Sequence, residues 1–285
     1  MTRHRPGFSL AEMMVALLLA GIIGLALTRL IISQARFVAL QDGMMRARSA
    51  SRAALNVMTG DLRAITDSGL VQASKDSITL RVPYAFGVAC NAISGATVVS
   101  LLPGDSALYG AAVASGHAWR DSVGAFHPVE PASLPATVSA AACTVPAGAP
   151  GIATLATAGW LATVVSVSPG RPPTTPPGNI VYLYQKIRYA FAPSASVPGR
   201  RALWRTVLST GTRDEMVVPF DTSSKFQFLV GNAYTLWPTP PTPLDDVRGI
   251  RIRLVGESET PMQGRTVPVK FYLTSDILFR NNARQ

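Results

Sequence analysis

The stretch Gly7-Phe8-Ser9-Leu10-Ala11-Glu12 opens an apolar run that continues to Leu27, and it follows a short basic leader. No charged side chain occurs between Glu12 and Arg29. As a helix that rises about 1.5 Å per residue, residues 8–32 would extend about 37 Å, which is enough to cross a bilayer with some tilt. The sequence therefore predicts a membrane-spanning helix near the amino terminus.

The position of the small residue Gly7 is unusual for a secretory signal. An ordinary signal peptide carries its small-residue cleavage site after the apolar run, whereas Gly7 precedes it, so cleavage there would leave the helix on the mature protein. Arg3 and Arg5 precede the span, so the positive-inside rule places the leader in the cytoplasm. Glu12 needs a partner, because a charge in the hydrocarbon layer costs about 2.5–3.5 kcal/mol on insertion scales.

This arrangement resembles the amino-terminal signal of type IV pilins and of type II secretion pseudopilins. The resemblance implies that a prepilin peptidase cleaves between Gly7 and Phe8 and that Phe8 becomes the N-methylated amino terminus. It also implies that Glu12 pairs with the terminal amine of a neighbouring subunit and sets the register of assembly. The alternative for Glu12 is an interfacial carboxylate that reaches toward the lipid headgroups.

The helix is expected to continue beyond the membrane. No proline occurs between Pro6 and Pro83, and Leu55, Met58 and Leu62 recur at the spacing of one helical face, which predicts a helix to Ile65. The predicted parts are a leader (1–7), a transmembrane half-helix (8–32), an amphipathic half-helix (33–66), and a periplasmic β-rich domain (67–285) with an insertion at about 84–159.

Beyond the helix the sequence changes to short apolar runs that alternate with polar residues, which is typical of half-buried strands. A long helix followed by consecutive strands predicts an α+β, pilin-like fold in which a mainly antiparallel sheet with long loops packs on the helix. Pro268 indicates that the last strand lies at an edge or begins late. The expected strands are Ile78–Val82, Trp160–Val167, Ile180–Phe191, Ala202–Leu208, Lys225–Val230, Gly249–Val255 and Val267–Leu273.

The carboxy-terminal part resembles the W-type minor pilins of type IV pili and, more distantly, the J-type pseudopilins of type II secretion. Four segments carry this resemblance: Ile187–Tyr189, Leu203–Arg205, Asp246–Leu254 and Phe271–Asn281. The segment 84–159 departs from both families, and its length favours a minor pilin. Because it is rich in Ala, Gly, Ser and Pro, we expect loops that are displayed or contact other subunits.

The two cysteines, Cys90 and Cys143, lie inside this insertion, 53 positions apart. Outside the cytoplasm an even pair favours a disulfide, which in the chain-entropy model would stabilise by about 4 kcal/mol for a loop of this length. Two buried free thiols are the alternative. The spacing is not that of a zinc site, which uses closely paired ligands.

Candidate catalytic and metal-binding residues do not form a known motif. His117, His127, Asp121 and Glu130 match no zinc or triad spacing, and the segment around them is predicted to be a loop. No calcium-type loop organises the acidic pairs 245–246 and 257/259. We therefore expect no enzyme, no cofactor and no metal site.

The chain of 285 residues carries a formal net charge of +10, which favours acidic partners. Arg251 and Arg253 are expected on one face of their strand, with Ile250 and Ile252 on the other. If they converge with Arg200 and Arg201, they would form a surface for DNA phosphates. A solvated basic surface is the alternative.

The resemblance implies a single-pass inner-membrane protein with its amino terminus in the cytoplasm and its carboxy-terminal domain in the periplasm, later incorporated into a surface pilus. Its partners would be prepilin peptidase, the major pilin and other minor pilins, the inner-membrane assembly platform, and membrane lipid before assembly. Its role would be to prime pilus assembly at the tip. The alternatives are a J-type pseudopilin and a tip module that binds DNA or a surface.

Overall fold

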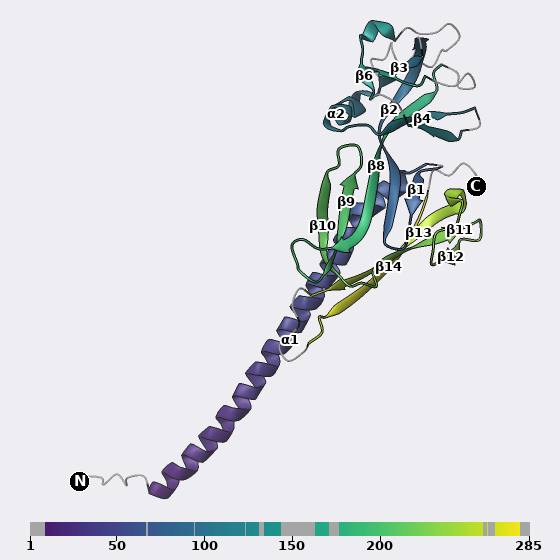
Figure 1. The fold of residues 1–285 in the computed structure, drawn as a ribbon. Coiled ribbons are helices and arrows are strands. Elements are labelled where there is room, and N and C mark those ends of the chain that lie inside the picture. The colour runs from purple at the N-terminus through teal and green to yellow at the C-terminus, as the bar shows by residue number, and fades with distance from the viewer. Residues whose placement is uncertain are drawn as a thin grey trace.

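The computed structural model contains a long helix that carries a two-lobed β-rich domain at its carboxy-terminal half (Figure 1). The predicted pilin-like α+β fold is confirmed. The structure describes residues 9–66, 68–93, 95–122, 124–130, 134–143, 163–170, 177–258, 261 and 266–279.

Helix α1, Leu10–Ala64, is 55 residues long, which corresponds to about 82 Å. It ends one residue before the predicted Ile65, which has an extended backbone. Residues 9–39 are all exposed, so the first half of α1 makes no buried contact with the domain. The second half packs on the sheet through five buried residues at spacings of three and four: Ala47, Ser51, Ala54, Met58 and Leu62.

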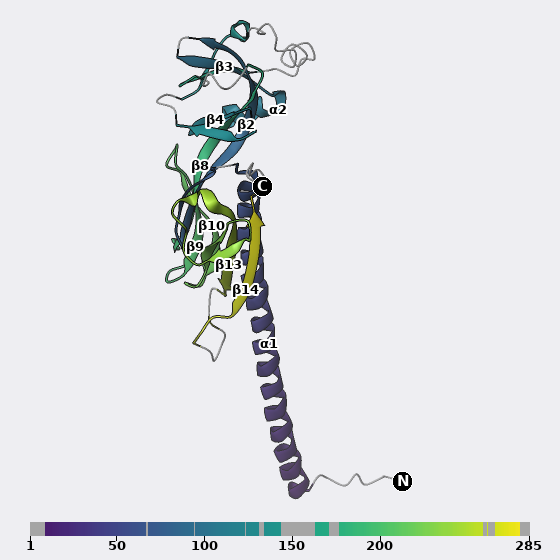
Figure 2. The same ribbon diagram turned by 90° about the vertical axis from the view of Figure 1, so that its right-hand side faces the viewer.

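We call the part of the domain beside α1 the helix lobe. Its sheet is antiparallel, and β14 runs along α1 (Figure 2). Its strands are β1 (Leu70–Ala73), the first half of β2 (Ser77–Ile93), the second half of β8 (Ile180–Pro193), β9 (Arg201–Val207), β10 (Arg213–Phe220), β11 (Lys225–Val230), β12 (Thr235–Trp237), β13 (Val247–Glu257) and β14 (Lys270–Leu278).

The core of the helix lobe lies between α1 and the inner face of this sheet. On β13, Ile250, Ile252 and Leu254 are buried while Arg251 and Arg253 face outward, as the alternation predicts. The sheet curls enough to bring β11 against the β1–β2 turn, where the amide of Phe226 donates to the carbonyl of Lys75 (2.8 Å). The expected strands at 78–82, 180–191, 202–208, 225–230 and 249–255 are confirmed to within two residues or lie inside longer strands, and β14 begins at Lys270, after Pro268.

The distal lobe lies beyond the end of α1 and is built on the extensions of β2 and β8 (Figure 1). It contains β3 (Ala96–Leu101), α2 (Pro103–Ala111), β4 (Gly116–Arg120), β5 (Phe126–Val129), β6 (Ala136–Thr137), the 3-10 turn η1 (Ala140–Ala142) and β7 (Val164–Val167). The expectation of loops in segment 84–159 is therefore wrong for its described part. Residues 160–162 of the expected strand 160–167 lie outside the described residues.

The core of the distal lobe includes Trp119, Leu101, Val165 and Leu183, so this lobe buries apolar surface of its own. Cys90 on β2 and Cys143 after η1 form a disulfide with a Cα–Cα distance of 5.2 Å. The bond closes a loop of 53 positions and attaches η1 to the sheet. For this loop length the chain-entropy model gives a stabilisation of about 4 kcal/mol.

Helix α1 and the sheet approach each other closely at Gly256 of β13. A Cβ atom at this position would lie 2.3 Å from the carbonyl oxygen of Ala47 and 2.6 Å from the hydroxyl of Ser51. Real side chains do not approach backbone this closely, so only glycine allows β13 to cross α1 at this distance. Gly256 therefore sets the spacing between the helix and the sheet.

We predict that Gly256→Ala lowers the free energy of unfolding by about 1–3 kcal/mol, because the added methyl forces α1 and β13 apart. Thermal unfolding of the full chain in detergent micelles measures the effect. Gly60→Ala is the matched control, since a Cβ there meets nothing within 4 Å and should stabilise the helix by up to about 1 kcal/mol. Equal stability of the two variants would contradict the prediction.

Candidate functional site

The amino-terminal end of α1 is organised by a reciprocal pair of hydrogen bonds between Ser9 and Glu12. The amide of Glu12 donates to the hydroxyl of Ser9 (3.2 Å), and the amide of Ser9 donates to the Glu12 carboxylate (3.0 Å). This capping box satisfies two amide groups that have no partner within the helix. The Glu12 carboxylate also lies at the positive end of the helix dipole, where a negative charge is stabilised.

Glu12 remains available to an external donor in this arrangement. The Ser9 amide bonds to Oε2, and a carboxylate accepts more than one hydrogen bond. Cleavage after Gly7 would leave the Ser9 amide intact, because the Phe8–Ser9 peptide bond is untouched. Gly7 and Phe8 themselves lie outside the described residues.

The apolar side chains of the first half of α1 are exposed all round the helix, with exposed fractions from 43% for Ile32 to 78% for Leu10. α1 is long and apolar enough to cross a membrane, and no residue of its most apolar window is buried inside the protein. A helix that is apolar on every side requires lipid or other helices as its surroundings. This half of α1 is therefore the candidate surface for contact with a membrane or with partner helices.

The four arginines predicted to bind DNA do not form one open cluster. Three are paired with carboxylates on different elements: Arg200 with Glu257 (3.3 Å), Arg201 with Asp76 (3.1 Å), and Arg251 with Asp276 (2.6 Å). The pairing with Asp276 raises the pKa of Arg251 and lowers that of the carboxyl.

Within the described part of the chain, Arg253 has no carboxylate at ion-pair distance, and its cross-strand neighbour is Lys225. Arg253 and Lys225 thus form a small basic pair on the outer face of the helix lobe. The other three arginines are each paired with a carboxylate of the same chain, so their charges are largely neutralised within the fold.

The candidate metal residues of the distal lobe are placed differently from the sequence prediction. His117 lies in strand β4 and is fully buried, with its ring 5.2 Å from that of Trp119. His127 bonds to Asp121 (2.7 Å), while Glu130 pairs with Lys186 (2.5 Å) and Arg81 (3.2 Å).

Among the described residues, no three His, Cys, Asp or Glu side chains are grouped to hold a metal ion. Of the acidic pairs, Glu257 is in the ion pair with Arg200, Asp245 lines a cavity described below, and Glu259 lies outside the described residues.

The prokaryotic N-terminal methylation motif matches residues 2–28 of the chain. No curated protein and no solved structure matches the chain. Together with the long helix and its sheet, the motif defines a prepilin-like protein of the type IV pilin and pseudopilin class, which is a substrate of prepilin peptidase and a component of a type IV pilus or a type II secretion system. Proteins with this motif are structural subunits, and the long apolar amino-terminal helix is consistent with that of a prepilin anchored in the inner membrane.

The sequence prediction missed Ser9 as a member of the site. The spacing Ser9-x-x-Glu12 ahead of an apolar run is the signature of a capping box and would have identified it. It also missed the cavity, for which no local sequence signal exists, because its lining comes from four separate segments.

The buried His117 gives the distal lobe a pH dependence. Burial lowers the pKa of His117 from 6.5 to about 4, and the nearby Pro169 backbone offsets this only in part. The unfolded chain therefore takes up a proton at a higher pH than the folded protein does, so stability is present above pH 6.5 and is lost as the pH falls toward 4.

We predict that the protein loses about 2 kcal/mol more stability between pH 7 and pH 4.5 than its His117→Leu variant. Denaturant unfolding at the two pH values, followed by tryptophan fluorescence, measures this difference. His127→Leu serves as the control, because His127 is mostly exposed. An identical acid loss in the protein and in His117→Leu would show that His117 is not responsible.

Proposed function

We propose that this protein is a minor pilin of the W type, which prepilin peptidase processes between Gly7 and Phe8 and which helps to prime type IV pilus assembly from the pilus tip. The processed subunit leaves the inner membrane and joins the major pilin and other minor pilins through the first half of α1. Its domain is periplasmic before assembly and lies on the cell surface afterward.

The observation that carries this proposal is the exposed apolar half of α1 combined with the N-terminal methylation motif. The motif supports processing, and the exposed half-helix supports a subunit that exchanges lipid for neighbouring helices. The Ser9–Glu12 capping box supports Glu12 as the assembly residue, since it holds the carboxylate at the helix end, next to the expected amino terminus of the mature chain.

The distal lobe supports a position at the tip. It stands beyond the carboxy-terminal end of α1, on the side away from the membrane-spanning half (Figure 1). In an assembly of parallel helices that grows by addition from the membrane, this lobe would extend away from the membrane, toward subunits that were added earlier. A subunit of this shape is accommodated most easily where no earlier subunit lies beyond it, which is the tip.

A J-type pseudopilin is the second candidate, because the same motif and fold serve type II secretion. The DNA-binding alternative has less support, since three of its four arginines are held in ion pairs. Gene neighbourhood separates the first two, because pilin genes favour the pilus and secretion components favour the pseudopilin.

We predict that Glu12→Ala is cleaved normally but reaches the surface at least about tenfold less, because truncating one member of a buried charge pair costs about 2–5 kcal/mol. Gly7→Arg should remain an uncleaved precursor in the membrane. Mass spectrometry of the amino terminus measures cleavage, and immunoblotting of the sheared surface fraction measures assembly.

Asp42→Ala is the matched control for Glu12→Ala, since Asp42 is an exposed carboxylate on the same helix beyond the apolar span. It should assemble normally. Normal surface assembly of both Glu12→Ala and Gly7→Arg would refute the proposal. Loss of protein secretion with intact pili in a deletion strain would assign the chain to the pseudopilins instead.

A further inference from the structure

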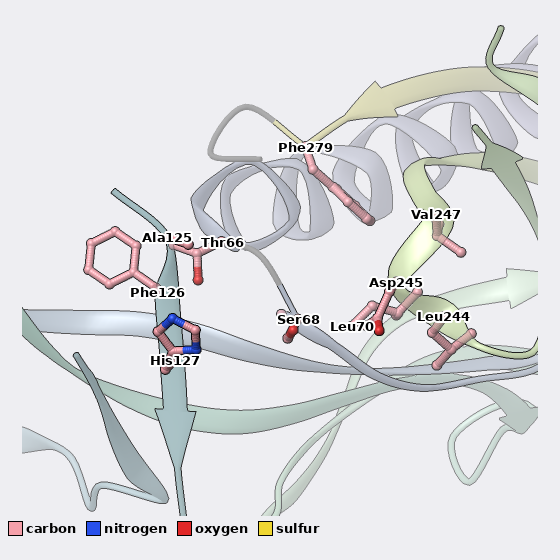
Figure 3. Close-up of a pocket in the computed structure, with 11 residues that line it drawn as sticks. Thr66, Ser68, Leu70, Ala125, Phe126, His127, Leu244, Asp245, Val247 and Phe279 are labelled. Carbon is pink, nitrogen blue, oxygen red and sulfur yellow. The ribbon is translucent and has the colours of Figure 1, made fainter. Parts of the chain in front are cut away.

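A cavity of about 170 Å³ lies where the two lobes meet the end of α1 (Figure 3). Leu244, Asp245 and Val247 of the helix lobe lie on one side, and Ala125, Phe126 and His127 of the distal lobe on the other. Thr66, Ser68, Gly69 and Leu70 cross between them, and Phe279 closes one edge. At about 30 Å³ per water molecule, the cavity has room for five or six waters, or for one long side chain.

Two described residues of the segment that crosses the cavity, Ser68 and Gly69, make specific backbone contacts. The amide of Gly69 donates to the carbonyl of Thr66 (2.9 Å), and a Cβ at position 69 would lie 2.7 Å from that oxygen. Ser68 has a left-handed backbone (φ 56°), and its carbonyl accepts a hydrogen bond from the Arg81 guanidinium (2.6 Å). These contacts define the shape of the cavity before any ligand enters.

The lining divides into an apolar part and a polar part. Leu70, Leu244, Val247 and Phe279 provide apolar walls. The hydroxyl of Thr66 is hydrogen-bonded to that of Tyr182 (2.5 Å).

Nε2 of the His127 imidazole is hydrogen-bonded to Asp121 (2.7 Å), so this ring nitrogen already has a partner within the protein. Among the described lining residues, Asp245 is the one carboxylate, and it is exposed to solvent at the edge of the cavity. No described cation lies within ion-pair distance of its carboxylate.

We propose that this cavity binds an alkylguanidinium or alkylammonium group, with the cation at Asp245 and the alkyl stem against Leu70, Leu244 and Phe279. A single carboxylate beside apolar walls fits a ligand that has one positive end and a short apolar stem. The volume is below that of sites for drug-sized ligands, which fits a single side chain or a small amine. The site is independent of the proposed function, since it uses no residue of the first half of α1.

The test is isothermal titration calorimetry of the full chain in uncharged detergent micelles, with n-butylguanidinium as the probe. We expect saturable binding that weakens with added salt. Asp245→Asn should weaken binding about tenfold or more, since it removes the charge from the hydrogen bond and changes the side-chain shape little. Asp246→Asn is the matched control, because it removes the adjacent carboxylate, which does not line the cavity, and it should bind as the unaltered protein does.

Two further probes test the chemistry. The neutral analogue n-butylurea should bind at least about tenfold more weakly, because it lacks the charge that Asp245 recognises. The peptide Gly-Gly-Arg-Gly-Gly identifies the source: binding comparable to that of the free probe assigns the site to an arginine or lysine side chain of a partner protein, and binding of the free probe alone assigns it to a small amine. Absence of saturable binding, equal binding by n-butylurea, or equal loss in both aspartate variants would overturn the proposal.

Discussion

The hydrophobic surface of the first half of α1 is the constraint on which the rest of the structure depends. Its apolar side chains are exposed on every side, and at about 25 cal/mol per Å² of apolar surface such a helix is not stable in water without lipid or partners. The domain leaves this surface free because it packs only on the second half of α1, through small residues such as Ala47 and Ser51 that face Gly256. One continuous helix thus has an exposed apolar half and a half that is packed on the sheet. The contact at Gly256 determines how closely the sheet packs on the second half.

Much of the fold was predictable because its signals are local. The end of α1 is within one residue of the prediction, since apolar spacing and the absence of proline can be read along one segment. The bounds of strands β8, β11 and β13 also lie within two residues of the predicted ones. Strand β4 was missed because its sequence has no alternation of its own: it is a strand through pairing with β8, more than 60 residues later, where His117 lies opposite Leu183. Burial of a histidine in such a strand depends on the whole distal lobe and cannot be read from its neighbours.

The candidate site residues likewise include some with a local sequence signal and some whose contacts depend on distant parts of the chain. Glu12 could be proposed from the sequence because its position relative to the apolar run is a sequence pattern, whereas the pairing of Arg201 with Asp76 joins residues 125 positions apart. The arginines that the sequence suggested for DNA belong largely to the fold, and one cross-strand pair of like charge, Lys225 and Arg253, remains on the surface. Such a pair is unfavourable for the sheet itself, so its place on the outer face allows water and salt to screen the repulsion.

The capping box explains how a carboxylate can be tolerated at the mouth of a membrane helix before assembly. Glu12 accepts a hydrogen bond from the Ser9 amide and lies at the positive end of the helix dipole, so part of the cost of removing it from water is offset within its own chain. These two interactions do not depend on a neighbour. Under the proposed function, a partner amine would supply only the remaining compensation, and it would meet a carboxylate that is already oriented by the first turn of α1. For the proposed assembly role of Glu12, Ser9 would orient the carboxylate in the same way before and after a partner binds.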